Sequence, residues 1–185
     1  MIGILPEALE VGSREIPINA DFRNVLTIFE AFNDPELTNE EKLYICLKRL
    51  YAVPVSYYET EEAYKQAVWF LNGGDLPMSK QEDVRLIDWK HDEAIIMPAV
   101  SKTVGVVDIR SIPYLHWWTF LGAFGEIGEG LFSTVVSLRQ KKARGEQLTK
   151  YEQKFWQKNK SLCKIITPEE QSAIDKTEAF LATII

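Results

Sequence analysis

A segment near the middle of the chain is apolar on almost every side. Residues 114–124 contain seven apolar side chains larger than alanine: Tyr114, Leu115, Trp117, Trp118, Phe120, Leu121 and Phe124. A helix with this pattern is usually buried on several sides or covered by a partner. It is too short to span a bilayer, which needs about 20 consecutive apolar residues. The segment therefore predicts the centre of a helical domain that does not enter a membrane.

The rest of the chain predicts a mainly α fold, a multi-helix single domain with a small N-terminal β-hairpin. Residues 7–18 hold two short alternating runs around Gly12-Ser13, which is a hairpin signal. Apolar residues at helical spacing follow for most of the remaining length. We expect residues 1–166 to form one helical domain. Residues 167–185 are expected to form a C-terminal amphipathic helix, packed on that domain or on a partner.

Polar residues mark the expected helix starts. These are Asn19 or Asp21, Thr38, Thr60, Asp88, Ser111, Thr149 and Thr167. Three of the threonines precede a glutamate by three residues, which is the capping-box pattern. Pro98 is expected to kink or divide the helix that contains it, because proline removes one backbone hydrogen bond. Four closely spaced glycines predict a bend near residues 125–128.

No group of residues predicts catalysis, a metal site or a cofactor. Asp88, His91 and Asp92 share one helical face, but the two acids suit a helix start, and zinc needs three or four ligands. His116 is expected to be a hydrogen-bonded structural residue, since no nucleophile is spaced to use it. Cys46 and Cys163 lie far apart in the sequence, which favours reduced thiols and a cytoplasmic protein.

The charge of the chain is unevenly distributed. The net charge is −6, but residues 139–164 hold nine Lys or Arg and two Glu, which is +7 and leaves −13 elsewhere. Lys150, Lys154 and Lys158 repeat every four residues along one helical face. This segment is a solvated face, a docking surface for an acidic or helical protein partner, or a nucleic-acid site. The acidic remainder disfavours nucleic acid.

Several segments resemble a known protein family. They are Leu5–Val11, Ile16–Arg23, Asp88-Trp89 with Asp92, Val107–Ile109, the Leu-His-Trp-Trp-Thr-Phe run at 115–120, Arg139, Lys141-Lys142 and Glu152–Lys160. In these segments the chain is similar to the tail-assembly chaperones of long-tailed (siphovirus-type) bacteriophages and prophages. The genes of that family lie next to the gene for the tape-measure protein. The run at 115–120 is the most specific part of the resemblance.

The resemblance implies a mainly helical, non-enzymatic chaperone. Such a protein binds the tape-measure protein in the host cytoplasm before the tail tube polymerises, and it is absent from the mature virion. The alternatives are a structural virion protein of the tail or head–tail junction, and a nucleic-acid-binding regulator. Binding by a chaperone of this kind would use helix-in-groove contacts with apolar anchors at helical spacing.

Three groups of residues are candidates for partner contact or self-association into a homo-oligomer. The aromatic group is Trp117, Trp118, Phe120 and Phe124. The basic group is Arg139, Lys142, Lys150, Lys154 and Lys158. The C-terminal group is Ile174, Phe180 and Leu181. The alternative for both apolar groups is burial in the core of the monomer, because wide apolar stripes normally face inward.

Overall fold

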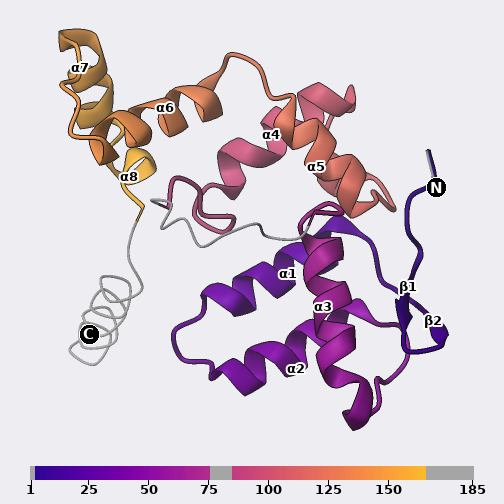
Figure 1. Cartoon of the computed structure of the whole chain (residues 1–185). Helices are drawn as coiled ribbons and strands as arrows, with labels where there is room; N and C mark the ends of the chain where they lie inside the picture. Colours follow the sequence, from indigo (N-terminus) through magenta and orange to yellow (C-terminus); the bar gives the residue numbers. More distant parts are fainter. Residues whose placement is uncertain (1–2, 76–84, 166–185) are drawn as a thin grey trace, which may run out of the picture.

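The computed structural model describes residues 3–75 and 85–165, and the expected C-terminal helix at 167–185 lies outside these residues (Figure 1). Over the described residues the fold is mainly α with a small N-terminal hairpin, as predicted. The strands are β1 (Ala8–Val11) and β2 (Arg14–Pro17). The α-helices are α1 (Phe22–Asn33), α2 (Asn39–Leu50), α3 (Thr60–Leu71), α4 (Glu93–Val104), α5 (Trp117–Gly125), α6 (Leu131–Ala143), α7 (Lys150–Lys158) and α8 (Lys160–Cys163). Two short 3₁₀-helices are η1 (Tyr57–Glu59) and η2 (Ile109–Ser111).

The N-terminal strands form the predicted antiparallel hairpin. Leu9 pairs with Ile16, and the turn uses Gly12 at a φ of +63°, a backbone conformation that suits glycine. Leu9, Val11 and Ile16 are almost completely buried, and β1 packs against α3. The hairpin therefore gains its stability by covering one side of the helices.

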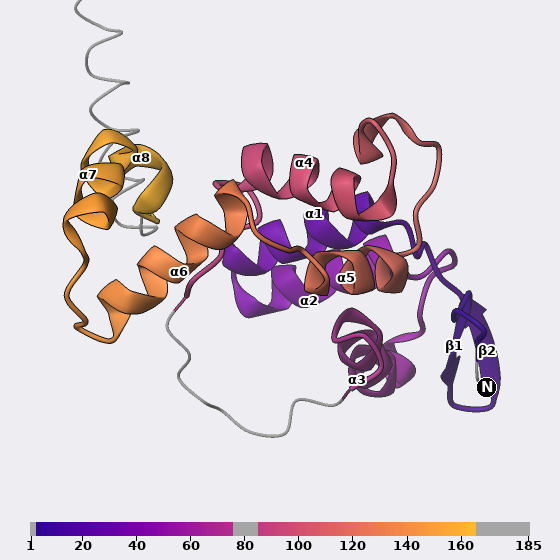
Figure 2. The same ribbon diagram turned by 90° about the horizontal axis from the view of Figure 1, so that it is seen from above.

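Helices α1, α2 and α3 form one part of the body beside the hairpin, and α4 and α5 form the other (Figures 1 and 2). Asp21 caps α1 by accepting a hydrogen bond from the backbone N–H of Arg23 at 3.0 Å. Thr38 and Glu41 form the predicted capping box of α2. These local signals define where α1 and α2 begin.

Helix α5 begins at Trp117, so the predicted start at Ser111 was wrong. Ser111 lies in η2, and the residues between it and α5 are largely extended. The backbone N–H of Phe22 donates to Leu115 O at 3.0 Å, and that of Trp117 donates to Ala20 O at 2.7 Å. This pairing with the chain before α1 holds the segment extended. The first helical turn is thereby delayed until Trp117.

The start predicted for the preceding helix was also wrong, because α4 begins at Glu93 rather than at Asp88. Asp88 instead caps a turn by accepting from the N–H groups of Lys90 and His91. Pro98 does not divide α4, which is continuous around it. Ala94 and Pro98 are both exposed, so water can satisfy the carbonyl that lacks an intrahelical donor.

Helices α6, α7 and α8 lie at the end of the molecule farthest from the hairpin in Figures 1 and 2. We call residues 131–165 the C-terminal arm. It follows the glycine-rich segment after Gly125, where the helix is interrupted as the sequence predicts. Within the described part of the chain, no helix is long and apolar enough to cross a membrane.

Stacked aromatic rings join the two halves of the body. The ring centroids of Phe22 and Phe120 are 4.9 Å apart, and those of Trp117 and Phe120 are 5.5 Å apart. The indole N–H of Trp117 donates to Leu71 O at 2.9 Å, so the polar atom of this buried side chain is satisfied. Leu115, Trp117 and Phe120 of the apolar segment are thus at the centre of the fold, whereas Tyr114, at its start, is 54% exposed.

Replacing Phe120 by alanine should therefore lower the free energy of unfolding by about 3–5 kcal/mol, because it leaves a cavity in this cluster. Urea denaturation followed by circular dichroism measures the change. The matched aromatic control is Tyr58→Ala, since Tyr58 is 95% exposed, and it should change stability by no more than about 0.5 kcal/mol. Equal effects of the two substitutions would contradict the central position of Phe120.

Candidate partner-binding surface

The four aromatic candidates on α5 differ in how deeply they are buried. Trp117 and Phe120 are 1% and 0% exposed, so they belong to the core of the body. Trp118 and Phe124 are partly exposed. Phe124 packs against Trp89 and Phe132, with ring centroids 5.0 and 5.3 Å away. Trp117 and Phe120 are therefore core residues, whereas Trp118 and Phe124 are only partly buried.

The position of Trp118 is fixed from two sides. Its indole N–H donates to Phe70 O at 2.8 Å, and its ring makes an edge contact with Trp69. Gly74 closes the other side, where a Cβ would lie 3.1 Å from the Trp118 ring. The φ of Gly74 is +98°, so a larger residue here would be strained in its backbone and would press against the Trp118 ring. Trp118 thus offers a partner only part of its surface.

Among the basic candidates, Arg139 is an interior residue that is 6% exposed. Its guanidinium forms a bidentate ion pair with Asp92, with Nη1–Oδ2 at 2.6 Å and Nη2–Oδ1 at 2.7 Å. It also donates to the carbonyl oxygens of Leu86, Leu162 and Cys163. All five N–H donors of the guanidinium are therefore used inside the protein.

This network connects three parts of the chain. Arg139 is on α6, the carboxylate is at the start of α4, and two of the accepting carbonyls end α8. Asp92 is 0% exposed, so its interpretation as an ordinary first-turn acid was wrong. Its carboxylate also accepts the backbone N–H of Asp88 at 3.0 Å. Arg139 consequently attaches the C-terminal arm to the body and is not available to a partner.

His116 and Cys46 lie inside the fold. Nδ1 of His116 accepts the backbone N–H of Trp118, so the ring proton is on Nε2, which donates to Pro6 O. His91 places Nε2 4.0 Å from Asp92 Oδ1. In the residues described, no group of three or more His, Cys, Asp or Glu is arranged to hold a metal ion. Cys46 is fully buried, and burial raises the pKa of its thiol to about 12.

The remaining cations of residues 139–164 are divided by whether they have an internal partner. Lys141 pairs with Glu152 at 2.6 Å, and Arg144 lies 3.9 Å from a carboxylate oxygen of Glu146. Five exposed lysines form no ion pair with any carboxylate in the described parts of the chain: Lys142, Lys150, Lys154, Lys158 and Lys160. The unpaired positive charge of the arm is therefore concentrated around α7.

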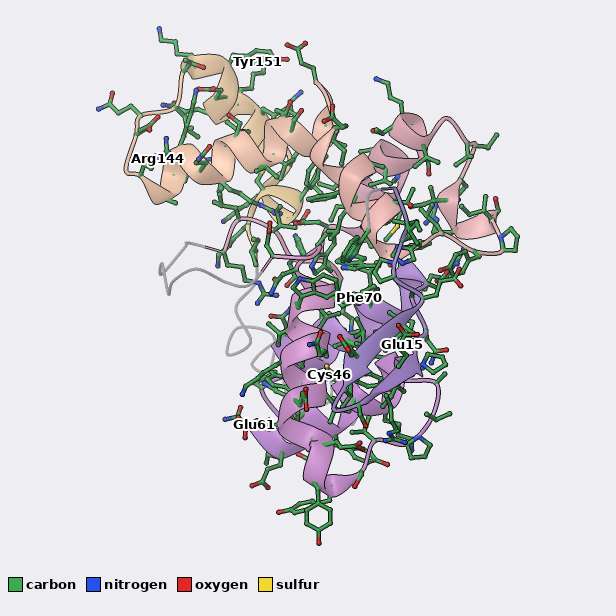
Figure 3. All side chains as sticks on the ribbon, turned by 45° about the vertical axis from the view of Figure 1, so that its right-hand side comes forward. Glu15, Cys46, Glu61, Phe70, Arg144 and Tyr151 are labelled. Atoms are coloured by element: carbon green, nitrogen blue, oxygen red, sulfur yellow. The ribbon has the colours of Figure 1, made fainter. Side chains whose placement is uncertain are left out.

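An open groove lies between the end of α6 and the outer face of α7, and we call it the α6–α7 groove. It has a volume of about 620 Å³. Lys142, Lys150 and Lys154 line it together with three glutamines and Glu146, and Leu148 and Trp156 supply its apolar part. Lys158 is on α7 but does not line the groove. In Figure 3, Arg144 and Tyr151 mark this end of the arm.

Trp156 was not among the candidates from the sequence, although it is the main apolar group of the groove. Lys142 Nζ lies over its ring, 5.3 Å from the centroid, in a cation–π contact. Trp156 is two residues from Lys154, which places it off the lysine stripe on α7. Trp156 follows Gln153 by three residues, so the two side chains are neighbours on the surface of α7. Gln153 also lines the groove, and this spacing is the sequence signal that could have identified Trp156.

The start of α7 is held against α6 by Glu152. Its carboxylate accepts a hydrogen bond from Lys141 Nζ at 2.6 Å and another from the backbone N–H of Thr149 at 2.8 Å. The hydrogen bond from Lys141, followed by the one from Thr149, lowers the pKa of Glu152 to about 2. One carboxylate thus completes the predicted capping box and also fixes one side of the α6–α7 groove.

Asp92→Asn should lower the free energy of unfolding by about 3–5 kcal/mol, because it leaves the buried charge of Arg139 without its counter-ion. Urea denaturation measures the loss. The control is Glu61→Gln, which breaks an exposed ion pair with Lys65 on α3 and should have a much smaller effect. A small loss for Asp92→Asn would mean that this ion pair does not stabilise the attachment of the arm.

Glu152 should make the stability of the arm depend on pH. Because its pKa is lowered on folding, the ionised carboxylate stabilises the fold fully above about pH 4.5, and this contribution disappears as the pH falls through about 2. The difference in free energy of unfolding between wild type and Glu152→Gln should therefore shrink over that interval. Denaturation curves recorded at several pH values measure it. Gln147→Ala, an exposed change between α6 and α7 that removes no titratable group, is the control and should show no such trend.

A family described as "Bacteriophage Gp15 protein" matches residues 1–165, a range that includes the hairpin, the body and the C-terminal arm. No curated protein matches the chain, and no solved structure does.

Proposed function

This chain belongs to the bacteriophage Gp15 protein family, and we propose that it is a tail-assembly chaperone that binds the tape-measure protein during tail morphogenesis. It acts by binding rather than by catalysis, in the host cytoplasm, and leaves before the virion is complete. The family supplies the phage context, and the Leu-His-Trp-Trp-Thr-Phe run at 115–120 supplies the resemblance to tail-assembly chaperones.

The observation that carries the proposal is the outer surface of the C-terminal arm. Three exposed lysines without an ion-pair partner in the described residues, Lys142, Lys150 and Lys154, line the same groove as a partly exposed tryptophan, Trp156. Unpaired charges at an exposed rim speed association and contribute modestly to affinity. A chaperone that must later release its client needs contacts of this moderate strength. The aromatic residues of α5, by contrast, support the chaperone by forming its core.

Co-expression with the tape-measure protein encoded in the same genome tests this function. We expect the tape-measure protein to be soluble and to co-purify with this chain, and to aggregate without it. Lys102→Glu, an exposed change on α4 far along the chain from the arm, is a control that should leave the solubilisation unchanged. Mass spectrometry of purified particles should then find the tape-measure protein without this chain.

Two outcomes would contradict the proposal. Stoichiometric retention of this chain in purified particles would identify it as a structural virion protein of the tail or head–tail junction. Failure to solubilise or bind the tape-measure protein, together with salt-dependent binding to DNA or RNA, would identify a nucleic-acid-binding regulator.

A further inference from the structure

We infer that the α6–α7 groove is the docking site for an acidic amphipathic helix of the client protein. The inference rests on the proposed function and adds to it the residues that bind and the chemistry of the segment that is bound. The partner segment is expected to place two carboxylates on one helical face, next to a large apolar side chain. Three properties of the groove lead to this assignment.

The first property is the sign of the charge. Lys142, Lys150 and Lys154 line the groove, and the acid that also lines it, Glu146, lies near Arg144. The groove is therefore positive, whereas the chain outside residues 139–164 carries a formal charge of −13. An acidic segment is attracted to this place and repelled from most of the remaining surface, so charge defines both the site and the direction of approach.

The same charge distribution argues for a protein segment rather than a nucleic acid. Strong nucleic-acid binding usually neutralises about 6–10 phosphates along a continuous basic surface. The groove offers three lysines, and the acidic remainder of the protein opposes a long polyanion. A short helix with a few carboxylates matches the number of available cations without extending over the negative body.

The second property is the spacing of the lysines on α7. Lys150 and Lys154 are four residues apart, so their Cα atoms are separated by about 6 Å along the helix axis. Carboxylates at positions i and i+4 of a partner helix have the same separation and face the same way. Two ion pairs can therefore form side by side when the partner helix lies along α7.

The third property is an apolar contact point beside the charges. Trp156 is partly exposed in the groove, and the largely buried Leu148 lies close to it. Tryptophan is enriched among the residues that contribute most to protein interfaces, particularly when charged or polar groups surround it. Lys142, which covers the ring at 5.3 Å, can pair with a carboxylate of the partner while an apolar side chain packs on the ring.

The groove is also formed before any partner arrives. The Lys141–Glu152 ion pair and the Thr149 capping box hold the start of α7 in place, and the Arg139 network holds the end of α8. A partner therefore does not have to order these helices when it binds, which removes one cost of association.

Binding of two probes tests the inference. The first is a capped synthetic helical peptide of about 18 residues with glutamates at i and i+4 and leucines on an adjacent face. The second is the tape-measure protein of the same genome. The full-length chain is compared with the double variant Lys150→Glu/Lys154→Glu and with Trp156→Ala. We expect each variant to weaken peptide binding by at least about tenfold in low salt, and higher salt to weaken the wild-type interaction.

Matched controls separate the groove from net charge and from aromatic content. Lys48→Glu/Lys102→Glu changes the net charge by the same amount at exposed positions on α2 and α4. Tyr151→Ala removes an exposed aromatic ring from α7 outside the groove. Both controls should bind the peptide within about twofold of wild type, a difference well under one tenfold step in affinity. Circular dichroism should show the same helix content in every variant.

Three results would overturn the inference. The wild-type protein fails to bind the peptide, or both lysine double variants bind it equally, or the groove is already occupied by the chain itself. Residues 166–185 carry four acids and one lysine, so they are the competing occupant. A zero-length carbodiimide cross-link from Lys150 or Lys154 to Glu169 or Glu170 in the isolated protein would reveal that occupancy.

Binding of the tape-measure protein shows whether the groove assignment or the proposed chaperone function has failed. If it binds wild type and the groove variants equally, the groove assignment is wrong and the chaperone function stands. If the peptide responds to the groove variants as expected but the tape-measure protein does not bind at all, the groove chemistry stands and the chaperone function is wrong.

Discussion

The ion pair between Asp92 and Arg139 determines how the C-terminal arm is joined to the body. Both side chains are buried, and removing two charges from water costs free energy that their mutual attraction offsets only when the geometry is good. Here the guanidinium uses all five of its donors, two of them on the carboxylate and three on backbone carbonyls. The carbonyls come from the segment before α4 and from the end of α8. The network therefore gives α6 and α8 one arrangement relative to α4, which nonspecific apolar packing alone would not specify.

The sequence predicted those elements whose signals are local. The hairpin followed from two alternating runs around Gly12, and the starts of α2 and α7 followed from capping boxes of neighbouring residues. The errors arose where distant parts of the chain compete with local preference. Helix α5 starts late because Leu115 and Trp117 pair with Phe22 and Ala20, which lie 93 and 97 residues earlier in the sequence. Asp92 resembled an ordinary helix-start acid because nothing near it in the sequence indicates Arg139.

The candidate surface was predictable only in part for the same reason. Lys150 and Lys154 were identified by their spacing, which one helix determines by itself. Whether a cation is free depends on tertiary contacts, and these assign Arg139 to the interior and Lys141 to Glu152. Trp156 contributes to the groove because the end of α6 brings Lys142 next to it. A basic stretch that looks uniform in sequence is thus divided in the structure into cations that hold the arm together and cations that remain on its surface.

This division matters for the proposed function, in which the protein binds a client and then releases it. If the same cations stabilised the arm and bound the client, association would compete with folding, and each event would weaken the other. The buried Arg139 and the capping carboxylate of Glu152 keep the groove in shape without using Lys150 or Lys154. The exposed lysines are screened by salt and contribute moderate, adjustable attraction, while Trp156 supplies a short-range apolar contact. Separating the two sets of charges therefore lets the strength of the proposed client binding change without changing the stability of the fold.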